Sequence, residues 1–241
     1  MIKWVGLLVG AMGVTVSGCG SDAERVAVGA ASVGAMTSAR VTSLTGASVT
    51  WTREGVAGLF LNATQAGLGG GEERSLPQGT TASMDVCVPL DMFKVPRVAV
   101  DPRFATVVRE IGLPGKGRII QQGWVLPSAV QAERVMRAVD KKLGACRYSG
   151  AAPVSLRPGQ RLWGKSVVHS YPRDLNGWKG YRIEQTAKAD GERVSVGTGV
   201  VLHRGPVVLR LEYVNYVPRT AEGALRTYNM GILRKVLMRR V

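Results

Sequence analysis

The sequence has few of the residues from which metal sites and nucleic-acid interfaces are usually built. It contains two histidines, His169 and His203, and three cysteines, with no Cys-x-x-Cys pair. We expect no metal site, because a site for zinc or a similar metal needs several such ligands at suitable spacing. Aromatic residues make up 6% of the chain, which argues against the basic and aromatic platforms that bind nucleic acid.

Motifs for nucleotides and for nucleophilic catalysis are also missing. The glycine-rich stretch that begins at Gly67 lacks the Gly-Lys-Ser/Thr tail of a phosphate-binding loop and continues into Glu72 and Glu73. No Gly-x-Ser-x-Gly elbow occurs in the chain. We interpret the glycine-rich stretch as a flexible loop, and we expect no cofactor and no enzymatic activity.

The first 19 residues have the layout of a secretory leader. Lys3 is followed by an uncharged apolar run from Trp4 to Val16 and by the small pair Ser17-Gly18. This run is too short to span a bilayer as a helix. Val16-Ser17-Gly18-Cys19 resembles a bacterial lipobox. That resemblance implies removal of residues 1–18, acylation of Cys19, for example with palmitate, and anchoring at the extracytoplasmic face of the cell membrane. The alternative is a secreted protein with an unmodified cysteine.

No later segment of the chain is apolar for long enough to cross a membrane. The 223 residues after the leader are enough for one large domain or two small ones. Residues 19–40 are rich in small residues without a clear period, and we predict that they form a flexible tether. Because we find no internal repeat and no further boundary, we predict a single domain over residues 41–241.

The chain is strongly basic, with 32 lysines and arginines against 17 aspartates and glutamates. Removal of Lys3, the only charged residue of the leader, lowers the net charge from +15 to +14. Such a charge predicts attraction to anionic surfaces and not a particular fold. For an exported protein, anionic lipid headgroups or wall polymers are the expected partners, besides an unknown protein partner. Alternatively, the charge only reflects the preference of a GC-rich genome for arginine.

Cys87 and Cys146 are the cysteines that remain beyond the leader. Disulfides persist outside the cytoplasm, and two cysteines allow only one intramolecular pairing. We therefore predict a Cys87–Cys146 disulfide. It would close a loop of about 59 residues, which the chain-entropy model values at roughly 4 kcal/mol.

Apolar periodicity predicts mixed secondary structure before residue 150. Thr52 is a good N-cap for a helix over residues 53–66, and Asp101-Pro102 is typical of the start of a second helix that would end at Gly112. A third helix from Ser128 to Cys146 has a capping-box start. Short strands are predicted for Met84–Val88 and Arg118–Leu126.

Strict alternation predicts a meander in the last third of the chain. Strands are expected near residues 163–171, 181–187, 194–202 and 207–213, with tight turns at Asp190-Gly191 and Arg204-Gly205. A final helix over residues 221–240 would present Leu225, Tyr228, Ile232 and Val236. Strands joined by two-residue turns are antiparallel, and such a sheet can leave one face for helices. The expected fold class is therefore α+β, a twisted antiparallel sheet with helices packed on it.

This layout resembles the extracellular sensor domain of PknH-type mycobacterial receptor kinases, which actinobacteria also carry on surface lipoproteins. The resemblance covers roughly residues 40–241. It depends on the segment Val56–Gly67, the strand with Cys87, the helix Ser128–Cys146, Arg204-Gly-Pro-Val-Val208 with the meander, and the C-terminal helix. It implies a twisted antiparallel sheet with flanking helices and a ligand-binding cleft. Family members commonly hold two disulfides, whereas this chain has cysteines for one beyond the leader.

Aromatic and basic residues are interleaved between residues 161 and 181. They are Trp163, Tyr171, Trp178 and Tyr181, together with Arg161 and Lys165 among the basic residues. Aromatic faces beside cations suit a sugar, a lipid headgroup or a wall polymer, so we predict a ligand-binding site here. The alternative is that the aromatic residues belong to the core and the basic residues to its rim.

The best interpretation is therefore a lipid-anchored extracytoplasmic protein with a non-catalytic, sensor-like domain that binds a ligand or an envelope component. One alternative is a carrier of lipids or glycolipids, which would need an apolar cavity between sheet and helices. Another is a hydrolase that uses His169, which would need a serine or an aspartate close to its ring. Neighbours in a strand point to opposite faces, so Ser170 is not expected to serve it.

Overall fold

The computed structural model describes residues 39–42, 48–76, 83–87, 95–151, 162–171, 176–189, 193–218 and 222–239. The chain divides into Met1–Ala30 and a compact unit over Ala31–Val241, and every described element belongs to the second. The predicted leader, Cys19 and nearly all of the predicted tether lie outside the described residues.

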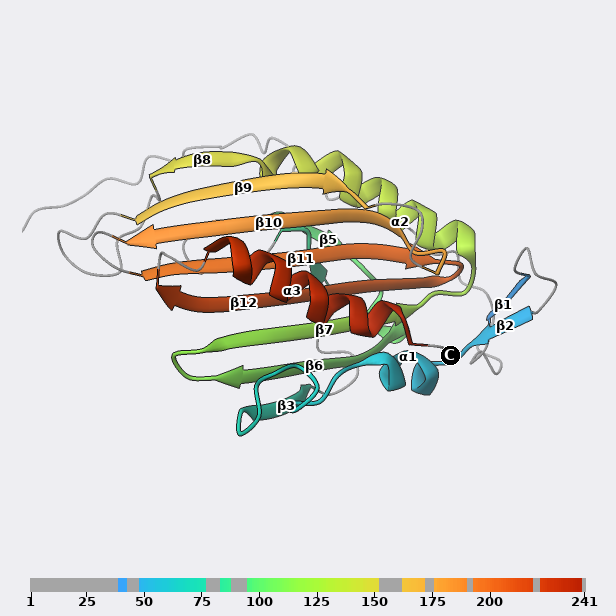
Figure 1. The fold of residues 1–241 in the computed structure, drawn as a ribbon. Coiled ribbons are helices and arrows are strands. Elements are labelled where there is room, and N and C mark those ends of the chain that lie inside the picture. Colours follow the sequence, from blue (N-terminus) through green and yellow to red (C-terminus); the bar gives the residue numbers. More distant parts are fainter. Residues whose placement is uncertain are drawn as a thin grey trace, which may run out of the picture. The chain divides into compact units, whose positions relative to one another are not determined.

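An eight-stranded antiparallel sheet forms the centre of the compact unit (Figure 1). The strand order is β3-β6-β7-β12-β11-β10-β9-β8. These strands are β3 (Glu72–Leu76), β6 (Ala105–Leu113), β7 (Gly117–Val125), β8 (Tyr148–Ala151), β9 (Leu162–Ser170), β10 (Lys179–Ala189), β11 (Arg193–Arg204) and β12 (Val207–Pro218). The predicted meander from β9 to β12 is at its centre, and the α+β fold class is confirmed.

Smaller elements complete the described part of the unit. β1 (Ala39–Thr42) pairs with β2 (Ser48–Trp51), and β4 (Ser83–Asp85) pairs with β5 (Arg97–Ala99). The helices are α1 (Arg53–Leu59), α2 (Ala129–Lys142) and α3 (Glu222–Leu237), with short 3₁₀ turns η1 (Pro102–Phe104) and η2 (Leu143–Cys146).

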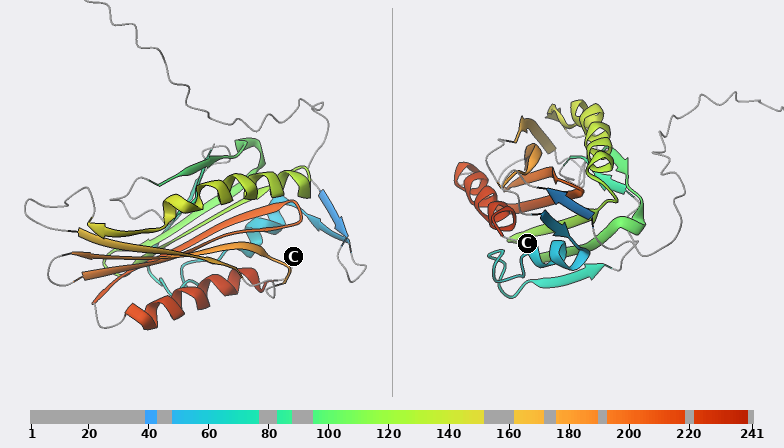
Figure 2. Two further views of the ribbon diagram at one scale, coloured as in Figure 1. Left: turned by 90° about the horizontal axis from the view of Figure 1, so that it is seen from above. Right: turned by 90° about the vertical axis from the view of Figure 1, so that its right-hand side faces the viewer.

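Helices cover both faces of the large sheet. In Figure 2, α2 and α3 lie on opposite sides of the strands. The side chains of β12 alternate between the two layers: Leu209 and Leu211 pack with residues of α1 and α3, whereas Val208 packs with residues of α2 and of β4 and β5. We call these sides the α3 face and the α2 face. Two separate hydrophobic cores therefore hold the sheet between its helices.

The predicted helix starts are confirmed at Thr52 and Ser128. The Thr52 hydroxyl accepts a hydrogen bond from the Gly55 amide at 2.9 Å, and Ser128 Oγ accepts one from the Gln131 amide at 3.3 Å. The first helix ends at Leu59, well before the predicted residue 66. Beyond it, the buried side chain of Gln121 in β7 both donates to and accepts from the backbone of residue 61, at 2.9 and 2.7 Å. The side chain of Gln121, from a strand, thus replaces the hydrogen bonds that a longer helix would give to this backbone.

The prediction of a helix over residues 101–112 is wrong. Asp101 does open a turn, because its Oδ1 accepts from the Arg103 amide at 2.9 Å, but only the 3₁₀ turn η1 follows. The chain then runs as strand β6, which pairs with β3 on one side and β7 on the other. Ile111 belongs to the core of the α3 face, and the buried Val108, three positions earlier in the strand, points to the opposite face. Pairing on both edges outweighs the helical spacing of these apolar residues.

The final helix is confirmed, but its buried face differs from the predicted one. Ile232 and Val236 are buried as expected, whereas Tyr228 is 43% exposed. Asn229 is buried in its place, where it accepts a hydrogen bond from Asn215 of β12 at 2.5 Å and donates one to a carbonyl of β11 at 3.2 Å. A polar side chain therefore points inward, where it forms hydrogen bonds with the sheet. Hydrophobic periodicity alone does not predict this orientation.

Candidate functional site

Cations gather on the part of the α3 face that helix α3 leaves uncovered. α3 packs chiefly on β11 and β12, and β9 lies beyond its edge (Figure 1). We define the basic face as nine side chains: Trp163, Lys165 and His169 of β9, Arg182, Glu184, Thr186 and Lys188 of β10, and Arg226 and Arg234 of α3. In both strands these positions alternate with residues that face α2, such as Val168 and Ile183.

Glu184 is the centre of one half of the basic face. Its carboxylate lies 3.2 Å from Arg182 Nε, 3.7 Å from Arg226 Nη1 and 3.8 Å from His169 Nε2. Arg226 also donates a hydrogen bond of 2.7 Å to the Thr186 hydroxyl, so α3 is joined to β10 at two points. Among the described residues, one carboxylate therefore faces several basic side chains.

Trp163 and two lysines form the other half. Trp163 is 41% exposed and pairs in register with Lys188, whose Nζ lies 6.0 Å from the centre of the indole ring. Lys165 is exposed, and it has no ion pair to a carboxylate among the residues that the structure describes. A flat aromatic surface thus lies next to solvated positive charge.

The electrostatic balance of the basic face favours an anionic ligand. Its lysines and arginines are Lys165, Arg182, Lys188, Arg226 and Arg234, and Glu184 is its one carboxylate among the described side chains. Such an excess of one sign attracts counter-charged groups over a distance set by the ionic strength. Beside it, the exposed indole can lie against apolar or headgroup surface, as tryptophan does at membrane interfaces.

The structure divides the predicted ligand-binding residues instead of assembling them. Trp163 and Lys165 belong to the basic face, and Arg161 lies outside the described residues. Tyr171 and Trp178 are buried in the core of the α3 face. Trp178 packs edge-on against Trp51, with ring centres 5.8 Å apart. The prediction of one site is wrong for these two rings, because they fill the core beside α1 and α3.

Tyr181 also does not belong to the predicted site, because it points to the α2 face. There its hydroxyl donates a 2.7 Å hydrogen bond to Asp140 of α2. Burial, followed by that hydrogen bond and the charge of Asp140, raises the pKa of Tyr181 to about 12. The residue fastens helix to sheet and cannot meet Trp163 across the strand.

His169 is part of the basic face and lies against Glu184 at 3.8 Å. Its sequence neighbour Ser170 is exposed and alternates to the other face of β9. Asp174, the aspartate nearest to His169 in the sequence, lies outside the described residues. Among the described residues, His169 thus lies beside a carboxylate that also pairs with arginines. This is not the arrangement of a nucleophile and its base.

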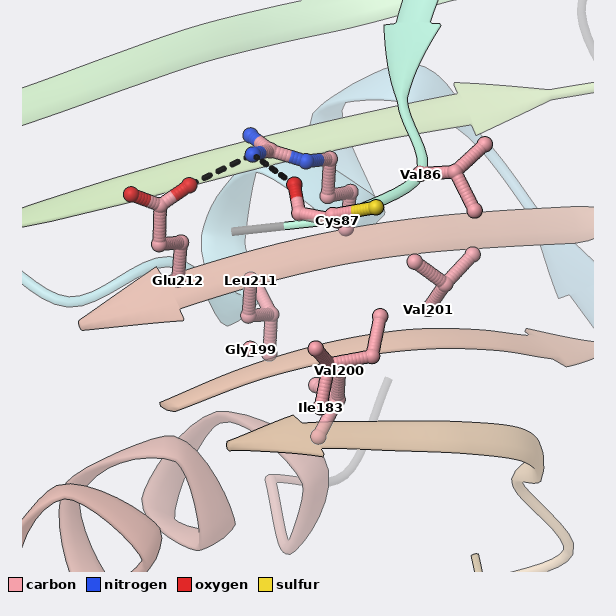
Figure 3. A pocket seen from close by; sticks show the side chains of 9 residues that line it. Val86, Cys87, Ile183, Gly199, Val200, Val201, Leu211 and Glu212 are labelled. Atoms are coloured by element: carbon pink, nitrogen blue, oxygen red, sulfur yellow. Dashed lines mark hydrogen bonds and ion pairs between the residues drawn. The ribbon is translucent and has the colours of Figure 1, made fainter. Parts of the chain in front are cut away.

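A buried ion pair lies under the β4 segment on the α2 face. Arg210 and Glu212 of β12 have 4% and 1% exposed side chains, and Arg210 Nη2 donates to Glu212 Oε2 at 2.5 Å. The neighbouring gap drawn in Figure 3 is too narrow to admit a water molecule. Burial raises the pKa of Glu212, and the positive charges of Arg210 and Arg118 act against this effect.

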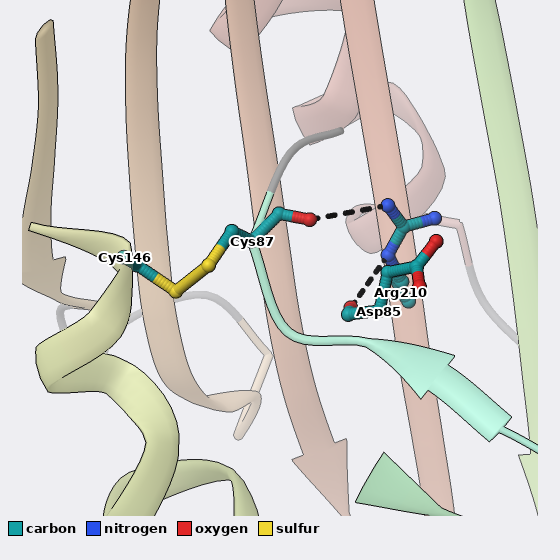
Figure 4. The surroundings of a disulfide bond; sticks show 4 residues. All are labelled: Asp85, Cys87, Cys146 and Arg210. Carbon is teal, nitrogen blue, oxygen red and sulfur yellow. Dashed lines mark hydrogen bonds between the residues drawn. A yellow bond between two sulfur atoms is a disulfide. The ribbon is translucent and has the colours of Figure 1, made fainter. Parts of the chain in front are cut away.

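Arg210 also holds the chain that leads to the disulfide. Figure 4 shows its guanidinium group donating to the carbonyl oxygens of Asp85, at 2.9 Å, and Cys87, at 3.4 Å. Cys87 is bonded to Cys146 at the end of η2, with the two Cα atoms 5.5 Å apart. This pairing agrees with the sequence-based prediction. One covalent link and one arginine therefore fix the same short segment over the sheet.

Sequence reasoning missed Arg210 and Glu212 as buried groups. They alternate with apolar residues in β12, a pattern typical of a strand with one solvated face. Here the β4–β5 pair and α2 cover that face, which local sequence does not reveal. The nearest signal is the charge pair itself, because residues i and i+2 of a strand lie side by side on one face.

The interfaces between sheet and helices are filled with side chains. On the α2 face, Trp124, Val139 and Val208 are fully buried, and on the α3 face so are Leu211 and Leu233. This packing does not favour the carrier alternative, which needs an apolar cavity there. Among the described residues, no three His, Cys, Asp or Glu side chains are grouped as metal ligands. No described helix is long and apolar enough to cross a membrane.

The fold of the chain is similar to that of a solved protein structure. No family model matches the chain, and no curated protein matches its sequence. The crystal structure of the extracellular domain of PknH from Mycobacterium tuberculosis is similar with a TM-score of 0.45 and 14% sequence identity. The match covers 77% of this chain and 96% of that chain.

Proposed function

We propose that this chain is a non-catalytic, lipid-anchored extracytoplasmic domain whose basic face binds anionic lipid headgroups. The observation that carries the proposal is that the described part of that face presents five lysine and arginine side chains and one carboxylate, next to the exposed ring of Trp163. Phosphate groups at a membrane surface offer the matching charge, and each lysine or arginine close to them contributes about 1 kcal/mol.

The anchor and the basic face complement each other physically. A single acyl chain holds a protein only marginally at a bilayer, and stable attachment takes a second acyl chain or a cluster of basic residues. Acylation at Cys19 would supply the first signal, and the basic face a second one. The leader and the Cys87–Cys146 disulfide support an extracytoplasmic location, because disulfides persist there.

Replacement of Cys19 tests the anchor. We expect the wild-type protein to incorporate a fatty-acid probe during growth and to sediment with membranes, whereas a Cys19→Ala variant should incorporate none. The measurement is in-gel detection of the probe on the immunoprecipitated protein. Equal labelling of both proteins, or labelling of neither, would show that Cys19 is not the acylated residue.

Charge removal from the basic face tests the binding partner. In co-sedimentation of the Ala31–Val241 unit with vesicles, we expect binding to anionic phosphatidylglycerol and little binding to neutral phosphatidylcholine. Replacing Lys165 and Lys188 by glutamine should weaken binding to the anionic vesicles about 30-fold, from about 1 kcal/mol for each charge. Raising the ionic strength should weaken it further.

The matched control removes two positive charges elsewhere, with glutamine at Lys116 and Arg134, both exposed. We expect this control to bind nearly as well as the wild type. If the two double variants lost equal affinity, total charge and not the basic face would drive binding. If the wild-type protein did not bind anionic vesicles but bound an isolated anionic wall polymer, the ligand of the basic face would be that polymer and not a lipid headgroup.

A further inference from the structure

A groove opens on the α2 face, beside the turn that joins β6 to β7. Its volume is about 300 Å³, and it extends from β3 to the end of β12. Glu110, Arg118 and Tyr216 are among the residues that line it. This size lies at the lower end of the range for small-molecule sites, roughly 300–1,000 Å³. The groove is separate from the basic face, which belongs to the other side of the sheet.

Arg118 has hydrogen-bond donors that the described residues do not use. Its side chain is 26% exposed, and its nearest carboxylate oxygens are Glu110 Oε1 at 3.8 Å and Glu212 Oε1 at 3.7 Å. Both distances exceed those of a hydrogen bond. Arg118 Nε and Glu212 Oε1 are also buried without a hydrogen-bond partner within the described part of the chain. A buried guanidinium nitrogen in this state gains free energy when an acceptor reaches it.

Glu110 provides the opposite charge at the same place. Its side chain is 36% exposed, and Arg118 is its one ion-pair partner among the described residues. Arg74 differs, because it already donates to both oxygens of Glu72 at 3.0 Å. The groove therefore offers a cation and an anion side by side, Arg118 and Glu110, and each can bind a ligand group of opposite charge. The other ion pair in the groove, between Arg74 and Glu72, already has its hydrogen bonds formed.

The walls of the groove add an apolar contact. Tyr216 is 41% exposed, and Leu113 and Pro114 contribute to the lining near the turn. A ligand with only one charge would leave either Arg118 or Glu110 unmatched. A zwitterion with adjacent charges matches both groups, and an apolar side chain can then lie against the tyrosine ring.

We propose that this groove binds a free α-amino acid with an apolar side chain. Its carboxylate accepts hydrogen bonds from Arg118, its ammonium group donates to Glu110, and its side chain lies along Tyr216. The site would make the domain a receptor for a small zwitterion, in addition to its binding at the membrane surface.

Isothermal titration of the full chain in detergent with leucine and with phenylalanine tests this proposal. We expect saturable binding of at least one of them. Leucinamide, which lacks the carboxylate, and N-acetylleucine, which lacks the ammonium group, should bind at least about tenfold more weakly, because each loses a charge-assisted contact. Glu110→Gln should cause a similar loss for leucine but leave the affinity for N-acetylleucine, which has no ammonium group to lose, low and unchanged.

Variants separate binding from folding. Arg118→Gln should abolish binding, and circular dichroism will show whether that variant is folded, since Arg118 also lies near the buried Glu212. Glu110→Gln lies at a partly exposed position and keeps the test valid if Arg118→Gln unfolds. Lys188→Gln, on the basic face, should bind leucine like the wild type. The proposal is overturned if neither amino acid binds, if the two blocked analogues bind as well as leucine, or if Glu110→Gln binds leucine unchanged.

Discussion

Replacing Glu212 by alanine is expected to lower the free energy of unfolding by about 3–5 kcal/mol, because this would leave the guanidinium group of Arg210 buried without its counter-charge. Arg210 has a side chain that is 4% exposed, so water cannot take the place of the lost carboxylate. Urea denaturation followed by circular dichroism measures this loss as a lower transition midpoint.

Two controls show whether burial is the cause. Glu72→Ala breaks an ion pair with Arg74 whose side chains are 69% and 66% exposed, and it should cost less than about 1 kcal/mol. Replacing both buried partners, Arg210 by methionine and Glu212 by leucine, should recover most of the stability lost in the single variant. A double variant as unstable as Glu212→Ala would mean that the charges themselves, and not their desolvation, hold the segment.

Removing the disulfide is expected to cost about 4 kcal/mol, from a loop with a sequence separation of 59 residues. The variant with serine at both Cys87 and Cys146 should unfold at a clearly lower urea concentration than the wild type. Reductant should bring the wild type down to the midpoint of that variant and leave the variant itself unchanged. If the wild type kept its midpoint after complete reduction of the bond, packing alone would hold this segment.

The disulfide and Arg210 fix the same residues, so their effects should not add. Arg210 donates to the carbonyl of Cys87, and the bond to Cys146 begins at the same residue. Once one link is lost, the segment is freer and the second link is worth less. Glu212→Ala combined with the two serine substitutions should therefore cost less than the sum of the separate losses.

Local signals predicted the parts of the fold that depend on near neighbours. Ser128 and the apolar stripe through Val139 are sufficient to define α2, and alternation from Tyr181 onward defines the meander. The prediction was wrong where partners distant in sequence decide. Val108 and Ile111 fit a helix equally well, and β3 and β7 on either side turn their segment into a strand.

The candidate sites were less predictable than the fold. Trp163 and Lys165 could be chosen from the local sequence, where aromatic and basic residues are interleaved. The basic face also needs Arg226 of α3, which lies 57 positions further along the chain than His169. Both of these side chains reach the same carboxylate, that of Glu184. Tyr171 and Trp178 have the same chemistry as exposed ligand-binding rings, and only packing against α1 and α3 assigns them to the core. The pair of Arg118 and Glu110 is visible only when β6 and β7 are placed in register.

Strand β3 forms one rim of the large sheet and has no neighbour there among the described strands. Its first three residues, Glu72, Glu73 and Arg74, are all exposed and charged. An uncovered strand otherwise offers its backbone amides and carbonyls as a template for another chain, and charged side chains make such lateral growth unfavourable. Copies crowded together on a surface are therefore protected from fusing their sheets along this rim.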